Sequence, residues 1–203
     1  MKHYLSALAA LFFLVACGER YDAIIKGGEV YDGTGAPGVV ADVGIKGDRI
    51  AAIGDLGGAK ADKVIDASGK AVAPGFINML SWSNESLLHD GLGQSELRQG
   101  VTLQVMGEGW SMGPLNERMK ERAVARQIDI HYPVDWTTLG EYLAKLEARG
   151  VAQNVASFVG ATTVRVHEVG YANRPAPPEE LARMQDLVRQ AMAEGALGVG
   201  SSL

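Results

Sequence analysis

The sequence predicts an α/β protein in which a small all-β portion precedes a region of alternating strands and helices. Short apolar segments separated by Gly-rich turns fill residues 21–71, and this pattern is typical of β-strands and hairpins. From residue 72 onward the pattern predicts strands that alternate with loops and helices. Such alternation favours a parallel sheet, because parallel strands need long crossover connections. The predicted portions are therefore 21–71 and 72–203.

The first portion contains a clear hairpin signal. Residues 41–46 alternate apolar and polar side chains with a period of two, as a half-buried strand does. Gly47 and Asp48 form a turn signal, and residues 49–54 supply the second strand. The apolar segment at 63–69 closes this portion.

The second portion is predicted to hold four strands and the helices between them. The strands are expected at 72–77, 101–106, 154–159 and 197–203, with helices within 84–99, 116–127, 138–149 and 178–194. The helix before Gly150 is best supported, because Thr137 or Thr138 can cap its start and the glycine can stop it. Its apolar residues recur at i, i+3, i+4 and i+7, namely Leu139, Tyr142, Leu143 and Leu146.

Residues 1–17 are predicted to be a lipoprotein signal peptide. The apolar run from Leu5 to Ala16 is short for a membrane span and ends in small residues before Cys17, the only cysteine. This ending resembles a bacterial lipobox, which implies cleavage before Cys17 and lipid attachment to its sulfur. The protein would then face the periplasm, and Gly18 favours the outer membrane. The alternative is an ordinary secretory signal with an incidental cysteine.

Charge argues against a nucleic-acid partner. The chain has 19 Lys and Arg against 24 Asp and Glu, a formal net charge of −5, and no dense run of basic residues. Neutralising phosphates requires clustered Lys and Arg. Hydrophobic residues make up 47% of the chain, so the mature part can supply a globular core.

Residues 73–82 read Ala-Pro-Gly-Phe-Ile-Asn-Met-Leu-Ser-Trp. This segment resembles the first barrel strand of the amidohydrolase superfamily, where Pro-Gly-Phe-Ile-Asp is followed by a metal-binding His-x-His pair. Here Asn78 replaces the aspartate, and Leu80 and Trp82 replace the histidines. Leucine has no lone pair and the tryptophan nitrogen is only a donor, so neither can ligate zinc. A wall for an apolar substrate group remains a possible role for Trp82.

The resemblance extends from residue 21 to residue 203 and is nearest to the N-acyl-D-amino acid deacylases. It implies a β-sandwich portion at 21–71, followed at 72–203 by about half of a (β/α)8 TIM barrel. It also implies zinc and hydrolysis of a C–N bond in an N-acyl amino acid or a related amide. A complete barrel needs about 250 residues, so we expect a truncated chain without amidase activity of its own. The alternative is a non-catalytic cell-envelope lipoprotein whose barrel face is a binding module.

The resemblance also indicates site residues. The deacylases carry a zinc-ligating cysteine in the loop after the second strand, where this chain has Gly-Glu-Gly around Glu108. A carboxylate can ligate zinc, so Glu108 is predicted to be a metal ligand or a substrate contact, with a solvated or ion-paired carboxylate as the alternative. Arg165 matches a family arginine and is predicted to bind a substrate carboxylate through its planar fork. A structural salt bridge is the alternative for Arg165.

Overall fold

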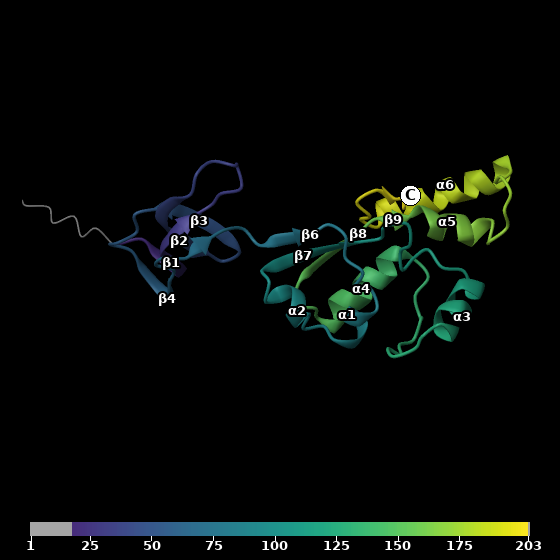
Figure 1. Cartoon of the computed structure of the whole chain (residues 1–203), viewed down its shortest axis with the longest axis horizontal. Coiled ribbons are helices and arrows are strands. Elements are labelled where there is room, and N and C mark those ends of the chain that lie inside the picture. The colour runs from purple at the N-terminus through teal and green to yellow at the C-terminus, as the bar shows by residue number, and fades with distance from the viewer. Residues whose placement is uncertain (1–17, 203) are drawn as a thin grey trace, which may run out of the picture. The chain divides into compact units, whose positions relative to one another are not determined.

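A computed structural model describes residues 18–202, and the chain divides after Pro74 into two compact units (Figure 1). The expected signal peptide and Cys17 lie outside the described residues. Among the helices of the described part, none combines the length and the apolar character needed to span a membrane.

The first unit is a mixed five-stranded sheet. Its strands are β1 (Arg20–Val30), β2 (Val39–Lys46), β3 (Arg49–Gly54), β4 (Lys60–Asp66) and β5 (Ala71–Val72). The order is β3-β2-β1-β4, and β5 also pairs with β1. The predicted hairpin is confirmed, because β2 and β3 are antiparallel and Lys46 faces Arg49 across the turn. Strands β4 and β5 run parallel to β1.

Two glycines in β1 allow this sheet to form. The pairing of β1 with β2 is irregular between Ile25 and Gly28. At this point Gly27 adopts a φ of +68°, and its N–H donates to Asp42 Oδ1 over 2.8 Å. A Cβ at Gly28 would lie 2.4 Å from the Val72 side chain. The glycines therefore let β1 continue past β4 and pair with β5.

The second unit contains parallel strands, as the sequence predicted. The strands β6 (Phe76–Asn78), β7 (Val101–Met106) and β8 (Asn154–Ser157) form one parallel sheet. A second parallel pair joins β9 (Val159–Gly160) to β10 (Val199–Gly200). The fold is mixed α/β, and residues 75–202 do not close into a barrel. The predicted third strand is wrong in its extent, since Val159 leaves β8 and pairs with Val199.

Helices separate these strands. They are α1 (Ser86–His89), α2 (Gln94–Leu97), α3 (Glu117–Ala125), α4 (Leu139–Arg149), α5 (Ala161–Glu168) and α6 (Pro178–Ala193). Helices α3, α4 and α6 confirm three predictions. The single helix expected within 84–99 is wrong, because Gly93 takes a left-handed φ of +50° and separates two one-turn helices. Helix α5 differs from the sequence prediction, which places no helix between residues 149 and 178.

Helix α4 anchors the core of the second unit. Thr138 and Glu141 form a reciprocal capping box at its start. Its predicted apolar face is confirmed, with Leu139, Tyr142 and Leu146 almost fully buried. The Tyr142 hydroxyl donates to the Asn84 carbonyl over 2.8 Å, which ties α4 to the chain before α1. The buried cluster continues through residues of β7, β9, α5 and α6.

Candidate functional site

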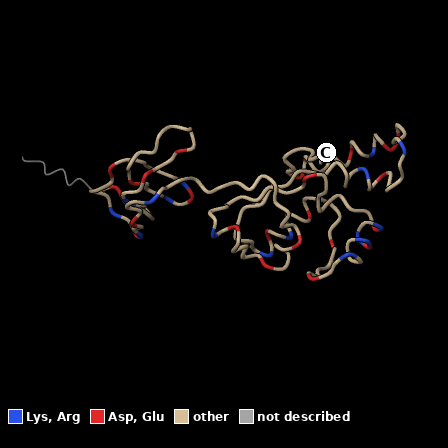
Figure 2. Tube along the Cα trace, viewed as in Figure 1, with Lys and Arg blue, Asp and Glu red and all other residues tan. Residues whose placement is uncertain are grey.

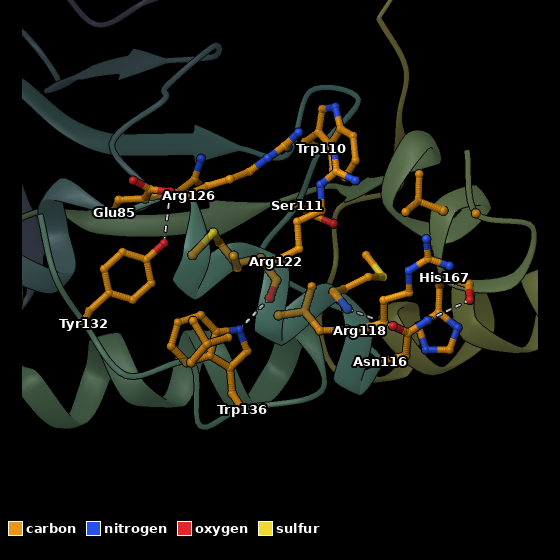
Figure 3. Close-up of a pocket in the computed structure, with 18 of the residues that line it drawn as sticks. Glu85, Trp110, Ser111, Asn116, Arg118, Arg122, Arg126, Tyr132, Trp136 and His167 are labelled. Atoms are coloured by element: carbon orange, nitrogen blue, oxygen red, sulfur yellow. Dashed lines mark hydrogen bonds between the residues drawn. The ribbon is translucent and has the colours of Figure 1, made fainter. Parts of the chain in front are cut away.

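The second unit contains a cavity of about 600 Å³. Its walls come from three segments, residues 82–86, 110–136 and 166–171, and Figure 3 shows their side chains. The first two segments follow β6 and β7, so the cavity adjoins the carboxyl ends of these parallel strands. That is where α/β folds carry their binding and catalytic groups. All three tryptophans of the chain, Trp82, Trp110 and Trp136, line the cavity.

Stacked aromatic rings form one wall. Trp136 is 2% exposed, and its indole N–H donates to the Met112 carbonyl over 2.5 Å. Its ring stacks on Tyr132 with centroids 6.1 Å apart and lies tilted against Tyr142 at 5.5 Å. The Tyr132 hydroxyl donates to Glu85 Oε1 over 2.9 Å. Burial and this hydrogen bond raise the pKa of Tyr132, so the phenol stays protonated and holds Glu85 in place.

A row of arginines forms another wall. Arg118, Arg122 and Arg126, labelled in Figure 3, follow one another at four-residue spacing along α3 and its C-cap, so they share one face of the helix. Figure 2 shows several basic residues in blue along α3. The Arg122 guanidinium lies 4.3 Å from the centroid of the Tyr171 ring. Within residues 18–202, none of these guanidinium groups makes an ion pair or a side-chain hydrogen bond.

Asn116 fixes the start of α3 against α5. Its side-chain oxygen accepts from the Met119 N–H over 3.0 Å, and its amide nitrogen donates to the His167 carbonyl over 2.9 Å. One residue therefore caps the arginine-bearing helix and joins it to α5, which carries His167.

His167 lines the cavity beside an ionised carboxylate. Its Nδ1 lies 2.9 Å from Glu168 Oε1, and Arg183 Nε donates to the other carboxylate oxygen over 2.6 Å. Burial raises the pKa of Glu168, but the hydrogen bonds from Arg183 and His167 outweigh it and lower the pKa overall. Because the carboxylate accepts, Nδ1 of His167 is the donor.

Close backbone contacts hold the loop after β7 to α5. Ser111 N–H donates to Thr163 Oγ1 over 2.8 Å, and Gly160 N–H donates to Ser111 Oγ over 2.9 Å. A Cβ at Gly160 would lie only 2.4 Å from the Gly109 carbonyl oxygen. The loop that carries Trp110 is therefore positioned by backbone packing that only glycine permits.

Of the predicted site residues, the structure places only Trp82 at the cavity, where its side chain is 59% exposed. Glu108 is half-buried in the loop after β7 and is not part of the lining. Arg165, on α5, donates to the carbonyls of Ala172 at 2.9 Å and Arg174 at 2.8 Å, which braces the loop after the helix. The roles of Glu108 and Arg165 in binding a metal or substrate stay predictions.

The residues of the described part do not fit a zinc site. No group of three or more His, Cys, Asp and Glu side chains within residues 18–202 is arranged to hold a metal ion. Beyond the end of β6, Leu80 and Trp82 offer no lone pair, and Glu108 alone would supply one ligand of the four that zinc usually takes.

Sequence reasoning missed most of the cavity. The arginine row was visible as a four-residue repeat at 118, 122 and 126, a spacing that places side chains on one helix face. Trp110 and Trp136 carried no comparable signal, because only the fold brings them to the same cavity.

No protein-family model matches the chain. Among curated proteins, it is 38% identical to a D-aminoacylase from Alcaligenes xylosoxydans xylosoxydans over 184 residues, covering 90% of this chain and 38% of the relative. It is 35% identical to an N-acyl-D-glutamate deacylase of the same organism over 186 residues, covering 91% of this chain and 38% of that relative. The chain therefore spans less than two-fifths of the length of these relatives.

The solved structures that match the chain include the same two kinds of enzyme. A D-aminoacylase, studied for its binuclear metal centre, matches with a TM-score of 0.79 at 38% identity, over 88% of this chain and 38% of the other. An N-acyl-D-glutamate deacylase from Bordetella bronchiseptica, complexed with zinc and a phosphonate inhibitor, matches with a TM-score of 0.77 at 34% identity. That match covers 89% of this chain and 38% of the deacylase.

Proposed function

Because the chain belongs to the D-aminoacylase-like amidohydrolases, with homology to the N-terminal portion of their longer members, we propose that the protein hydrolyses a linear amide. The bond is the C–N bond of an N-acyl amino acid or a related compound. The likeness in sequence and backbone to D-aminoacylase carries this proposal. The proposal assigns no step to a metal, since the described residues offer no ligand set.

The proposal extends to the architecture. Residues 75–202 would correspond to the beginning of a (β/α)8 barrel, and residues 20–72 to part of the β-sandwich beside it. The parallel order β6-β7-β8 supports this assignment, as does the place of the cavity beyond the ends of β6 and β7. In such barrels the groups that act on substrate stand at this edge.

The protein expressed from its own gene is expected to release free amino acid from N-acetyl-D-leucine or N-acetyl-D-glutamate, measured by colorimetric detection of the new amine. Residues 1–203 expressed alone are expected to release none, because the described residues offer no set of metal ligands. Trp82→Ala is expected to raise KM about three- to tenfold, because an exposed aromatic wall contributes on the order of 1 kcal/mol to binding. Leu92→Ala is the matched control, since Leu92 is also largely exposed but lies outside the cavity lining. Failure to release amine from either substrate, with and without added zinc, would contradict the hydrolase.

A binding module is the second candidate, and the end of β6 favours it. Leu80 and Trp82 occupy the positions where the superfamily pattern has metal-binding histidines, and both are exposed apolar side chains. Such side chains suit contact with an acyl group rather than with an ion. Saturable retention of an N-acyl amino acid in equilibrium dialysis, without any release of amine, would support this candidate over the enzyme.

We also propose that Cys17 carries a lipid and that the protein faces the periplasm from the outer membrane. The lipobox-like ending at residues 14–17 supports this proposal. Cys17→Ala is expected to abolish incorporation of labelled palmitate and to move the protein from the membrane pellet to the soluble fraction. Gly18→Asp serves as the control, because it should keep the lipid and change only the membrane in which the protein is found. A Cys17→Ala protein that still takes up palmitate would refute the anchor.

A further inference from the structure

We propose that the cavity of the second unit binds a small organic dianion, with a flat apolar body and two separated carboxylate groups. This inference concerns binding alone and does not depend on hydrolysis. It follows from the charges, the rings and the size of the cavity, taken together.

The arginine row gives the cavity lining more positive than negative charge. The lining contains three arginines and two glutamates. Glu168 is paired with Arg183, which lies outside the lining. Glu85 accepts only from the neutral Tyr132 hydroxyl, so it offsets one of the three arginine charges. The guanidinium groups of Arg118, Arg122 and Arg126 have no such partner within residues 18–202. Free cations gathered on one wall, in a chain whose net charge is −5, indicate an anionic ligand.

The spacing of the row indicates two anionic groups rather than one. Successive arginines are four residues apart, which is about 6 Å along the helix axis at a rise of about 1.5 Å per residue. A single carboxylate accepts two parallel hydrogen bonds from one guanidinium group. Like charges at i and i+4 repel each other on a helix, so a ligand with two separated carboxylates would relieve this repulsion at two neighbouring arginines.

The aromatic lining indicates that the part of the ligand between its charged groups is flat and apolar. Trp82 and Trp110 are 59% and 39% exposed, which leaves ring surface open to the cavity. Flat apolar groups stack on such rings in offset or edge-to-face arrangements. Aromatic rings can also attract cations, but the three arginines would repel a cationic ligand. A volume of about 600 Å³ suits a small molecule rather than a peptide segment.

Tryptophan fluorescence of the full chain tests this proposal directly, because all three tryptophans line the cavity. Titration with terephthalate, which carries carboxylates on opposite sides of a ring, is expected to change the emission saturably at millimolar concentration or below. Benzoate should bind about three- to tenfold more weakly, and neutral benzamide more weakly still, as each lost ion pair removes on the order of 1 kcal/mol. Raising the salt concentration should weaken terephthalate most.

Substitutions test whether binding depends on the three arginines of the row or only on the overall charge of the protein. The triple variant Arg118→Gln, Arg122→Gln, Arg126→Gln should weaken terephthalate binding at least tenfold. Arg98→Gln is the matched control, because Arg98 contacts Gln94 and lies outside the lining. These arginines are exposed, so far-UV circular dichroism should stay unchanged. Equal binding of terephthalate and benzamide, or full binding by the triple variant, overturns the proposal. Tighter binding of phenyl phosphate than of terephthalate would overturn the requirement for two separated groups.

Discussion

Replacing Trp136 with alanine is expected to lower the free energy of unfolding by about 3–5 kcal/mol, the range found when a large buried aromatic side chain is truncated. Trp136 is 2% exposed and packs between the rings of Tyr132 and Tyr142. Alanine would leave a cavity between these rings and would also leave the Met112 carbonyl without its indole donor. The effect should therefore combine lost packing with an unpaired polar group.

Urea denaturation followed by circular dichroism measures this change. Trp82→Ala is the matched control, with an expected loss below about 1 kcal/mol because its side chain is mostly exposed. Trp136→Phe should fall between the two, since a ring remains but the hydrogen bond to Met112 is lost. A Trp136→Ala protein as stable as the Trp82→Ala protein would show that the stacked wall contributes nothing to the fold.

Gly160→Ala is expected to cost about 1–3 kcal/mol, the usual penalty for overpacking a filled site. The φ of Gly160 is −73°, which alanine adopts freely, so the penalty is steric alone. The new methyl group would lie 2.4 Å from the Gly109 carbonyl oxygen and 2.8 Å from the Ser111 nitrogen. Both atoms belong to the backbone and cannot turn away as a flexible side chain can.

The control for this substitution is Gly58→Ala. Gly58 has no atom within 4 Å of an added Cβ, and its φ is not in the left-handed region. Alanine there should leave stability unchanged or raise it slightly, because it restricts the unfolded chain. Thermal unfolding of the two variants should therefore separate them by several degrees. Similar melting temperatures would mean that the loop after β7 moves to accept the methyl group.

Local patterns predicted the elements whose signals lie within one segment. Helix α4 followed from its apolar spacing and from a capping threonine, and the β2–β3 hairpin followed from Gly47 and alternating side chains. Helix α5 was missed because Thr162, Thr163 and Val164 are β-branched and disfavour helix locally. Burial decides its conformation instead, with Thr163 and Val164 packed in the interior, and tertiary packing overrides propensity.

The candidate site was harder to predict, for a related reason. Trp82 was predicted because it lies in a motif next to a strand. The cavity also needs Trp110, Trp136 and His167, which are brought together by contacts such as that of Asn116 with the His167 carbonyl. Such contacts join residues about 50 positions apart. A periodic pattern describes one helix or strand, so it cannot show which elements meet.

The closely packed glycines of the loop after β7 and of β10 also limit which mutations the gene can accept. A Cβ would come within 2.1 Å of the Phe158 oxygen at Gly107, and within 2.2 Å of the Gly107 oxygen at Gly200. A change in the first or second base of a glycine codon replaces glycine with another residue or with a stop codon. Every such replacement residue adds a side chain. At these positions, only third-letter changes are silent. We therefore expect few tolerated substitutions at Gly107 and Gly200, and many at the exposed arginines of α3.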